Sequence, residues 1–258
     1  MQLILDGRAI AYDYTASSDG QAPVLFLHGA LGVRGQFDAL RKLFPERGQL
    51  APDFAAHGES QSGAGQASSE RLARDMLALM DAHDIASVDV IGHSMGGYAG
   101  LVMAHLAPRR VNRIVTLGTK FYWTGDVIGK TRADLDAGLL RSRSQRFYDA
   151  LAATHTAEGA DGVLAFAQEL IGDFARWQLD EDMLRAAGVP VLVCAGDRDN
   201  MVPAAEVLRL FGALDPKISG AAILPGTPHP LQQAPLDCFA QSVRRFWDFA
   251  PGKERGAG

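Results

Sequence analysis

The stretch of residues 88–100 constrains the fold of this chain more than any other. A β-branched run opens it and leads into Gly-x-Ser-x-Gly at residues 92–96, and an apolar run begins directly behind that motif. This order predicts a strand, a tight turn with Ser94 at its apex, and a helix. Such a sharp turn has no space for a β-carbon two residues before or after the serine, which explains Gly92 and Gly96. The Ser94 hydroxyl should therefore project from the carboxyl end of a strand.

Gly-x-Ser-x-Gly is a weak signal by itself, because the chain has 28 glycines and chance matches in glycine-rich loops are common. The flanking strand and helix strengthen it. A serine hydroxyl also needs an adjacent base to become a nucleophile, and that base needs an acid to hold its tautomer. The motif is therefore informative only if an acid and a histidine follow it.

Short apolar runs alternate with helical patterns along most of the chain. The runs expected to be strands cover residues 2–5, 9–14, 24–27, 49–52, 88–91, 111–117, 189–195 and 221–224. The expected helices cover residues 36–44, 69–83, the segment from Ser94 to Pro108, 204–211 and 235–249. Several strand runs lack polar alternation, as in strands covered on both faces. The pattern predicts an α/β fold, with a mainly parallel sheet flanked by helices.

The alternation is lost between about residues 120 and 187, where charged, helix-like segments replace it. We expect residues 119–187 to form an inserted helical cap or lid. Residues 1–118 and 188–258 would then form the α/β core.

Seven histidines compete to be the base for Ser94. His229 alone lies in a Gly/Pro loop just after a late strand, from which it can reach back over the edge of the sheet. The other six are expected to line that edge (His28, His57), to point away from the serine (His93), or to be solvated or structural (His83, His105, His155).

The acid should lie at the end of the strand that precedes His229 in the chain, and two aspartates qualify. Asp197 would fall in the tight turn directly after Gly196, where an Asx turn is the simpler role. Asp199 comes two residues later, where the loop can direct it towards His229. We favour Asp199, which completes the chain order Ser94, Asp199, His229.

These stretches resemble the α/β-hydrolase superfamily, and within it the small, cofactor-free, esterase-like branch with a helical cap. The resemblance spans residues 20–249 and rests on the stretches at residues 27–30, 53–60, 92–97, 196–203 and 226–229. It implies a nucleophile elbow at Ser94, with Asp199 and His229 completing a catalytic triad. It also implies an oxyanion hole formed by the backbone N–H groups of Ala30 and Met95.

Two of these stretches depart from the family pattern. Ala56 stands where the turn at residues 53–60 usually carries glycine, which puts the local turn geometry in question. Pro228 and Pro230 flank His229 and should stiffen its loop, because proline restricts φ and removes an N–H donor.

The resemblance implies a serine hydrolase that cleaves small carboxylic esters or thioesters through an acyl-enzyme on Ser94. A carbon–carbon bond hydrolase or lyase with the same triad is the alternative, and a non-catalytic ligand-binding protein on this fold is a third possibility. Serine at position 94, rather than aspartate, argues against the haloalkane dehalogenases and epoxide hydrolases of the same fold. Leu31, Phe121 and Trp123 are the candidates for substrate contact, with ordinary core packing as the alternative for the two aromatic residues.

The composition excludes several other classes. The chain carries 25 basic and 30 acidic residues, so no basic excess favours nucleic acid as a partner. No apolar run of some 18 residues predicts a membrane span, and the N-terminal residues do not resemble a signal peptide. Cys194 and Cys238 do not suggest a metal site. We therefore expect a cytoplasmic enzyme with a small-molecule ester substrate, without a cofactor or metal; the sequence carries no signal for its oligomeric state.

Overall fold

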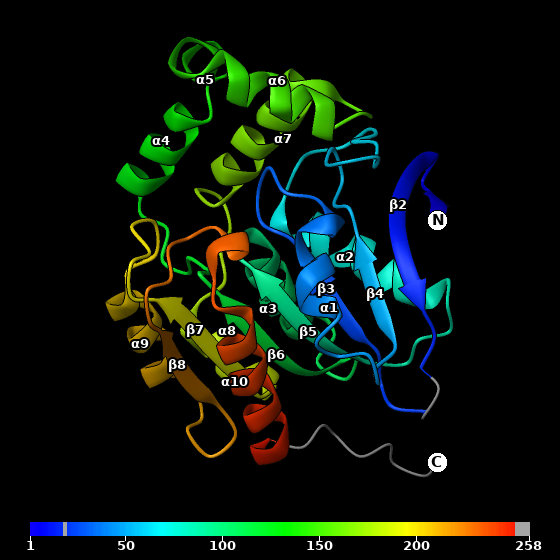
Figure 1. Cartoon of the computed structure of the whole chain (residues 1–258), viewed down its shortest axis with the longest axis vertical. Coiled ribbons are helices and arrows are strands. Elements are labelled where there is room, and N and C mark those ends of the chain that lie inside the picture. Colours follow the sequence, from blue (N-terminus) through cyan, green and yellow to red (C-terminus); the bar gives the residue numbers. More distant parts are fainter. Residues whose placement is uncertain (18–19, 251–258) are drawn as a thin grey trace.

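The computed structural model describes residues 1–17 and 20–250, so residues 18–19 and the last eight residues of the predicted core, 251–258, lie outside the description. The described residues form one eight-stranded sheet in the order β1-β2-β4-β3-β5-β6-β7-β8 (Figure 1). Its strands are β1 (Gln2–Leu5), β2 (Arg8–Thr15), β3 (Val24–Leu27), β4 (Gln49–Pro52), β5 (Val88–His93), β6 (Val111–Leu117), β7 (Val191–Gly196) and β8 (Gly220–Leu224).

The sheet is mainly parallel. β2 pairs antiparallel with β1 and β4, whereas β4, β3, β5, β6, β7 and β8 run parallel to one another. All eight predicted strands form, each within two residues of its expected ends. The predicted α/β fold class is confirmed.

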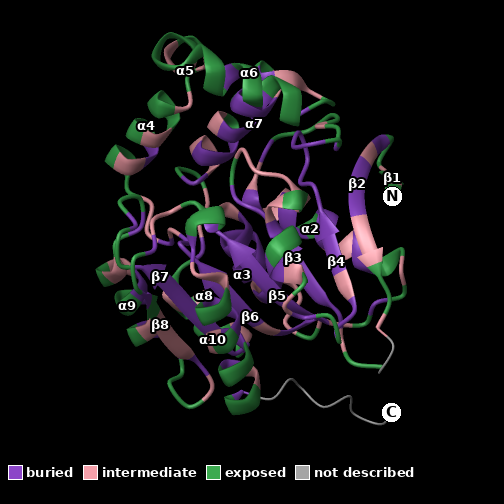
Figure 2. Cartoon of the chain, in the orientation of Figure 1, coloured by how far each residue is buried: buried purple, intermediate pink, exposed green. Residues whose placement is uncertain are grey.

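Helices cover both faces of this sheet because its central strands are apolar on both sides. In β3, Val24 and Phe26 pack into one apolar cluster and Leu25 and Leu27 into the other. The first cluster lies under α1 (Asp38–Arg41) and α10 (Leu236–Phe249). The second lies under α2 (Ser69–Asp81), α3 (Met95–Leu106), α8 (Glu181–Ala187) and α9 (Ala204–Ala213). Figure 2 shows the central strands buried between these helices.

The helix predicted at residues 36–44 is α-helical only over residues 38–41. The segment begins with a 3₁₀ turn, η1 (Arg34–Phe37), and continues as the single α-helical turn α1. It ends in two bonds of the 3₁₀ type, from the Leu43 N–H to the Leu40 carbonyl and from the Phe44 N–H to the Arg41 carbonyl. Pro45 lacks the N–H that would continue an α-helix, so the last turn tightens instead.

Four further helices lie between β6 and β7, above the carboxyl edge of the sheet (Figure 1). They are α4 (Gly125–Asp134), α5 (Ala137–Arg143), α6 (Gln145–Thr154) and α7 (Gly159–Asp173). α6 and α7 bury an apolar cluster of their own around Leu151 and Val163. α8, also in this insertion, instead packs against α3.

The strand register brings the ends of five strands to one edge. Leu27 pairs with Gly92, His93 with Leu117, Leu117 with Cys194, and Gly196 with Leu224. The loops that follow β3, β5, β6, β7 and β8 therefore emerge side by side, as expected at the carboxyl edge of a parallel sheet. Among the described helices, none has the length and apolar character that crossing a bilayer would require.

Candidate active site

Ser94 occupies the turn between β5 and α3 with φ +51° and ψ −119°. This conformation is strained for a residue with a β-carbon. The neighbouring glycines make the turn possible: a β-carbon on Gly92 would collide with the Gly97 backbone, and one on Gly96 with the Leu27 carbonyl. The Thr119 hydroxyl donates a hydrogen bond to the Ser94 carbonyl (3.0 Å) and braces the turn from the end of β6.

The imidazole of His229 lies between Ser94 and Asp199. Its Nε2 is 3.1 Å from the Ser94 Oγ, and its Nδ1 is 2.8 Å from the Asp199 Oδ2. The carboxylate can only accept, so Nδ1–H donates to Asp199 and Nε2 is left to accept the serine proton. Gly118, at the end of β6, leaves room for this pair, because a β-carbon there would lie 3.0 Å from Asp199 and 3.3 Å from the His229 ring.

Asp199 is held in place by its own loop. Its Oδ1 accepts the N–H groups of Met201 (2.8 Å) and Val202 (2.9 Å). Burial alone would raise the pKa of Asp199, but the hydrogen bond from His229 and these backbone N–H groups outweigh burial and lower it. The carboxyl therefore stays ionised beside the histidine.

The structure corrects the role predicted for Asp197. Its Oδ1 accepts the Thr227 N–H (3.0 Å), 30 residues further along the chain, and so ties the β7 loop to the loop that carries His229. The local Asx-type bond that sequence reasoning expected of Asp197 is made instead by Asp199, to Met201. The local sequence favours such a turn at either aspartate; packing against the β8 loop selects between them.

The two N–H groups predicted to hold an oxyanion belong to Met95, next to Ser94 in the chain, and to Ala30, in the turn that packs on the elbow. Met95 is the first residue of α3, where N–H groups have no partner within the helix. Ala30 follows Gly29, which packs so closely on the elbow that a β-carbon there would lie 3.3 Å from the Ser94 Cβ. Neither of these N–H groups donates a hydrogen bond to another group within the described residues.

The turn that carries Ala30 is held by hydrogen bonds at Gly29. The Gly29 carbonyl accepts from His28 Nδ1 (2.8 Å) and the Gly32 N–H (3.1 Å), while the Gly29 N–H donates to the Gln36 Oε1 (3.2 Å). In a trans peptide the carbonyl and the next N–H point in opposite directions. Fixing the Gly29 carbonyl therefore also fixes the direction of the Ala30 N–H.

Gln36 and His93 connect this turn to the histidine loop, a role that the sequence did not indicate. The Gln36 amide nitrogen lies 3.4 Å from His93 Nδ1, and His93 Nε2 lies 2.8 Å from the His229 carbonyl. The sequence predicts that His93 points away from the serine; in the structure its ring lies 5.1 Å from that of His229. Burial lowers the pKa of His93 to about 4, so the ring is neutral near pH 7.

The three candidates for substrate contact lie in different surroundings. Leu31 is half-buried and lines a cavity of about 400 Å³ between the Ala30 turn and α6. Phe121 is buried in the core against Tyr98. Trp123 stacks on Phe174 with ring centroids 4.5 Å apart. Packing alone accounts for the contacts of both aromatic residues.

The lining of this cavity carries no charge. It consists of Leu31, Gly32, Val33, Gly35, Gln36, Phe147, Ala150, Leu151, Thr154 and Gln232. Gln36 contacts the Gly29 N–H, and Gln232 follows His229 closely in η2 (Leu231–Gln233). The cavity therefore lies beside the serine site.

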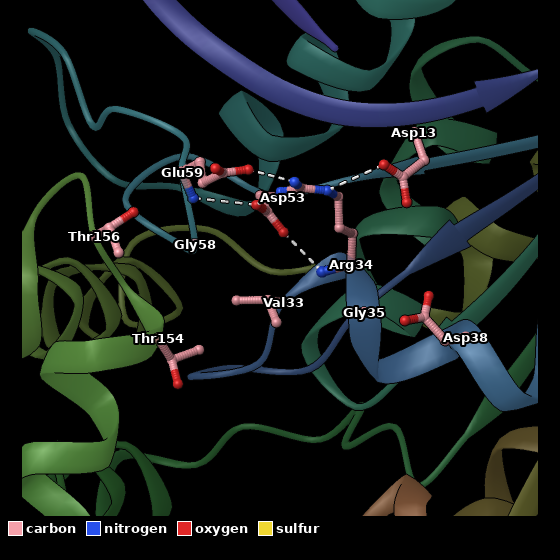
Figure 3. Close-up of a pocket in the computed structure, with 10 residues that line it drawn as sticks. All are labelled: Asp13, Val33, Arg34, Gly35, Asp38, Asp53, Gly58, Glu59, Thr154 and Thr156. Atoms are coloured by element: carbon pink, nitrogen blue, oxygen red, sulfur yellow. Dashed lines mark hydrogen bonds and ion pairs between the residues drawn. The ribbon is translucent and has the colours of Figure 1, made fainter.

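A neighbouring cavity of about 470 Å³ has a different character (Figure 3). Its wall carries four carboxylates, and Arg34 pairs with three of them, those of Asp13, Asp53 and Glu59. The Arg34 N–H also donates to Asp53 (2.7 Å). This network ties β2, η1 and the turn after β4 together and contains neither Ser94 nor His229.

Comparisons with known proteins agree with this architecture. A family model described as the alpha/beta hydrolase fold matches residues 22–138. The dihydrolipoyllysine-residue acetyltransferase component of the acetoin cleaving system of Pseudomonas putida is 27% identical over 256 residues, which cover 93% of this chain and 67% of that protein. For the protein of the same name in Cupriavidus necator the identity is 27%, covering 78% of this chain and 58% of that protein. This chain thus spans about two thirds or less of these curated relatives.

A solved structure of a thermophilic esterase from Thermogutta terrifontis superposes with a TM-score of 0.76 at 20% identity. The match covers 96% of this chain and 97% of the esterase chain. At this identity the likeness shows a shared fold and no more.

Proposed function

This chain belongs to the α/β-hydrolase superfamily, and on that premise we propose that it is a serine hydrolase that cleaves small carboxylic esters or thioesters. One observation carries the proposal: the His229 ring bridges the Ser94 hydroxyl (3.1 Å) and the Asp199 carboxylate (2.8 Å). This is the geometry that lets an imidazole act as a general base towards a serine.

In the proposed mechanism the Ser94 Oγ attacks the acyl carbon while His229 Nε2 takes its proton. The N–H groups of Ala30 and Met95 stabilise the tetrahedral oxyanion, and losing one such donor costs about 3–4 kcal/mol in comparable sites. His229 then protonates the leaving alkoxide or thiolate, which departs and leaves the acyl group on Ser94. A water molecule, deprotonated by His229, releases the acid by the same route.

The cavity beside the site supports an uncharged substrate. All ten of its lining residues are neutral, so a charged group placed there would lose hydration without gaining an oppositely charged partner. Its volume of about 400 Å³ falls in the range of sites for small molecules. Leu31 is the proposed substrate contact, and residues 119–187 are the proposed cap that closes over it.

The test is hydrolysis of p-nitrophenyl esters with two to twelve acyl carbons, beside Ser94→Ala and a fluorophosphonate label. We expect labelling at Ser94 and a turnover that Ser94→Ala abolishes while its thermal unfolding stays that of the wild type. Retained turnover in Ser94→Ala would show a different nucleophile. A labelled enzyme without esterase activity would favour the carbon–carbon bond hydrolase or lyase, and an unlabelled, inactive protein would favour ligand binding.

Acyl transfer is a second candidate, because the relative that matches 93% of this chain is named as an acetyltransferase component. Transfer would use the same acyl-enzyme, with a thiol or alcohol taking the place of water. Adding a dithiol to the ester assay separates the two: transfer yields the S-acyl product, whereas hydrolysis yields only the free acid.

A further inference from the structure

One buried side chain of the cap, that of His155 at the C-terminal end of α6, lies within hydrogen-bond distance of the turn that carries Ala30. Its Nε2 lies 3.2 Å from the Leu31 carbonyl, and its Nδ1 lies 2.9 Å from the Gly58 nitrogen. The sequence predicts a solvated or structural role for His155. Its ring in fact spans three segments that are remote in sequence: the turn after β3, the turn after β4, and the cap.

The hydrogen bonds of His155 determine which nitrogen carries the proton. The Gly58 N–H can only donate, so Nδ1 accepts and Nε2–H donates to the Leu31 carbonyl. Burial lowers the pKa of His155, which keeps the ring in this neutral form.

Leu31 is held from both sides. Its N–H donates to His57 Nε2 (3.2 Å), and its carbonyl accepts from His155 Nε2 (3.2 Å). Its φ is +58°, a left-handed conformation that a residue with a β-carbon rarely adopts. Such a conformation persists only where the surroundings impose it.

The Leu31 carbonyl shares a peptide with the Gly32 N–H, which donates to the Gly29 carbonyl (3.1 Å), and that carbonyl shares a peptide with the Ala30 N–H. Without the bond to its carbonyl, Leu31 could relax to negative φ, turn the Gly32 N–H away from Gly29 and so release the Ala30 N–H.

We propose that His155 is a positioning residue through which the cap holds the Ala30 N–H in place for the oxyanion. The inference rests on the proposed hydrolase function. The donor acts on charge that develops in the transition state, so its misplacement lowers kcat and leaves KM nearly unchanged. A residue that served only to attach the cap would not lower kcat while leaving KM nearly unchanged.

Two substitutions of His155 separate its two contacts. In His155→Asn the amide oxygen can replace Nδ1 towards Gly58 but the side chain is too short for Leu31; in His155→Gln the amide nitrogen can replace Nε2 towards the Leu31 carbonyl. We expect His155→Asn to lower kcat about 10-fold, with KM within about twofold, since the Ala30 N–H is displaced rather than removed. His155→Gln should recover most of that loss.

Glu158→Ala is the matched control. Glu158 also joins the cap to the core, by accepting from the N–H (2.7 Å) and hydroxyl (2.8 Å) of Ser62, but it does not contact the Ala30 turn. We expect its kcat to stay within about twofold of the wild type. An equal loss of kcat in Glu158→Ala and His155→Asn would overturn the inference, as would a His155→Asn enzyme with unchanged kcat.

A measurement on the wild-type protein decides the matter if His155→Asn does not fold. Nitrogen-15 NMR of the histidine rings should find the His155 proton on Nε2, and a proton on Nδ1 would overturn the inference. This measurement needs no substrate. Absence of ester turnover in the wild type would count against the proposed function alone. The position of the proton would still test whether His155 donates to the Leu31 carbonyl.

Discussion

Asp199 and Asp197 are close in sequence and of the same type, but they accept hydrogen bonds from different partners. Both are aspartates in the loop after β7, yet one accepts from His229 and the other from the Thr227 backbone. Asp199 is almost fully buried, and its hydrogen bonds to the His229 ring and to two backbone N–H groups lower its pKa. A residue name and its spacing do not distinguish these roles; the direction of each side chain does.

Asp199→Asn should lower kcat for a p-nitrophenyl ester on the order of 10⁴-fold, because an amide cannot hold the His229 tautomer that accepts the serine proton. Asp197→Asn keeps an oxygen for the Thr227 N–H and should change kcat only a few-fold. Steady-state kinetics of the two variants provides the check. The reverse order of losses would identify Asp197 as the acid.

At the scale of elements, the helices α4, α5 and α6 begin where the sequence provides N-caps. Thr124 and Asp136 accept the N–H three residues ahead, at the starts of α4 and α5, and Ser144 does so for α6. These bonds satisfy N–H groups that have no partner inside the helix. The turn at residues 53–58 is the opposite case, because Ala56 adopts φ +65° with a β-carbon. The departure from glycine leaves the turn formed, with strain at one residue.

The strain at Ala56 can be measured against its neighbour. Ala55 and Ala56 are both fully buried, and only Ala56 has a positive φ. Replacing either by glycine loses a buried methyl group (about 0.8 kcal/mol) and gains unfolded-chain entropy (about 0.5–1 kcal/mol). Only Ala56→Gly also relieves left-handed strain, which is worth about 1–2 kcal/mol. Urea unfolding should therefore find Ala56→Gly near wild-type stability and Ala55→Gly lower by about 1.5 kcal/mol; equal losses would contradict the strain.

At the scale of the whole molecule, four buried histidines connect the sheet, the candidate site and the helices between β6 and β7. Burial lowers the pKa of His28 to about 3 and of His93 to about 4, and lowers those of His57 and His155 as well. His28, His57 and His155 lie in a row, with successive ring centroids 5.1 and 5.5 Å apart. The folded protein therefore excludes protons that the unfolded chain binds below about pH 6.5.

Because the folded protein keeps these histidines unprotonated, we expect its free energy of unfolding to fall in acid. Above about pH 6.5 the histidines are neutral in both states and contribute no pH dependence; below it, protonation of the unfolded chain lowers the free energy of unfolding. Each linked histidine contributes up to about 1.4 kcal/mol per pH unit until its folded pKa is reached. Asp199 changes the pH dependence of the free energy of unfolding only below the pKa of its carboxyl group in the unfolded chain. Above that pKa the stabilisation from the ionised carboxylate is complete. Urea unfolding between pH 7.5 and 4.5 provides the measurement, and a flat profile would contradict the prediction.

Local pattern by itself determined much of this protein. Apolar runs of the right length and period predicted all eight strands. They also predicted the parallel sheet, because a strand buried on both faces has apolar residues at consecutive positions. Gly-x-Ser-x-Gly predicted the elbow, because a turn this sharp has no space for a β-carbon at Gly92 or Gly96. Chain order then brought Ser94, Asp199 and His229 to the same edge, where the structure joins them by hydrogen bonds.

Only the tertiary structure decided how that edge is held together. The contacts of Gln36, His93 and His155 join segments 57 to 136 residues apart, and no periodicity or motif records such pairs. The same applies to Leu31, whose left-handed backbone is imposed by two histidines from other elements. A sequence pattern reports which residues share a face or a turn; which side chain reaches which carbonyl depends on how separate elements pack, and that is determined only when the chain is folded.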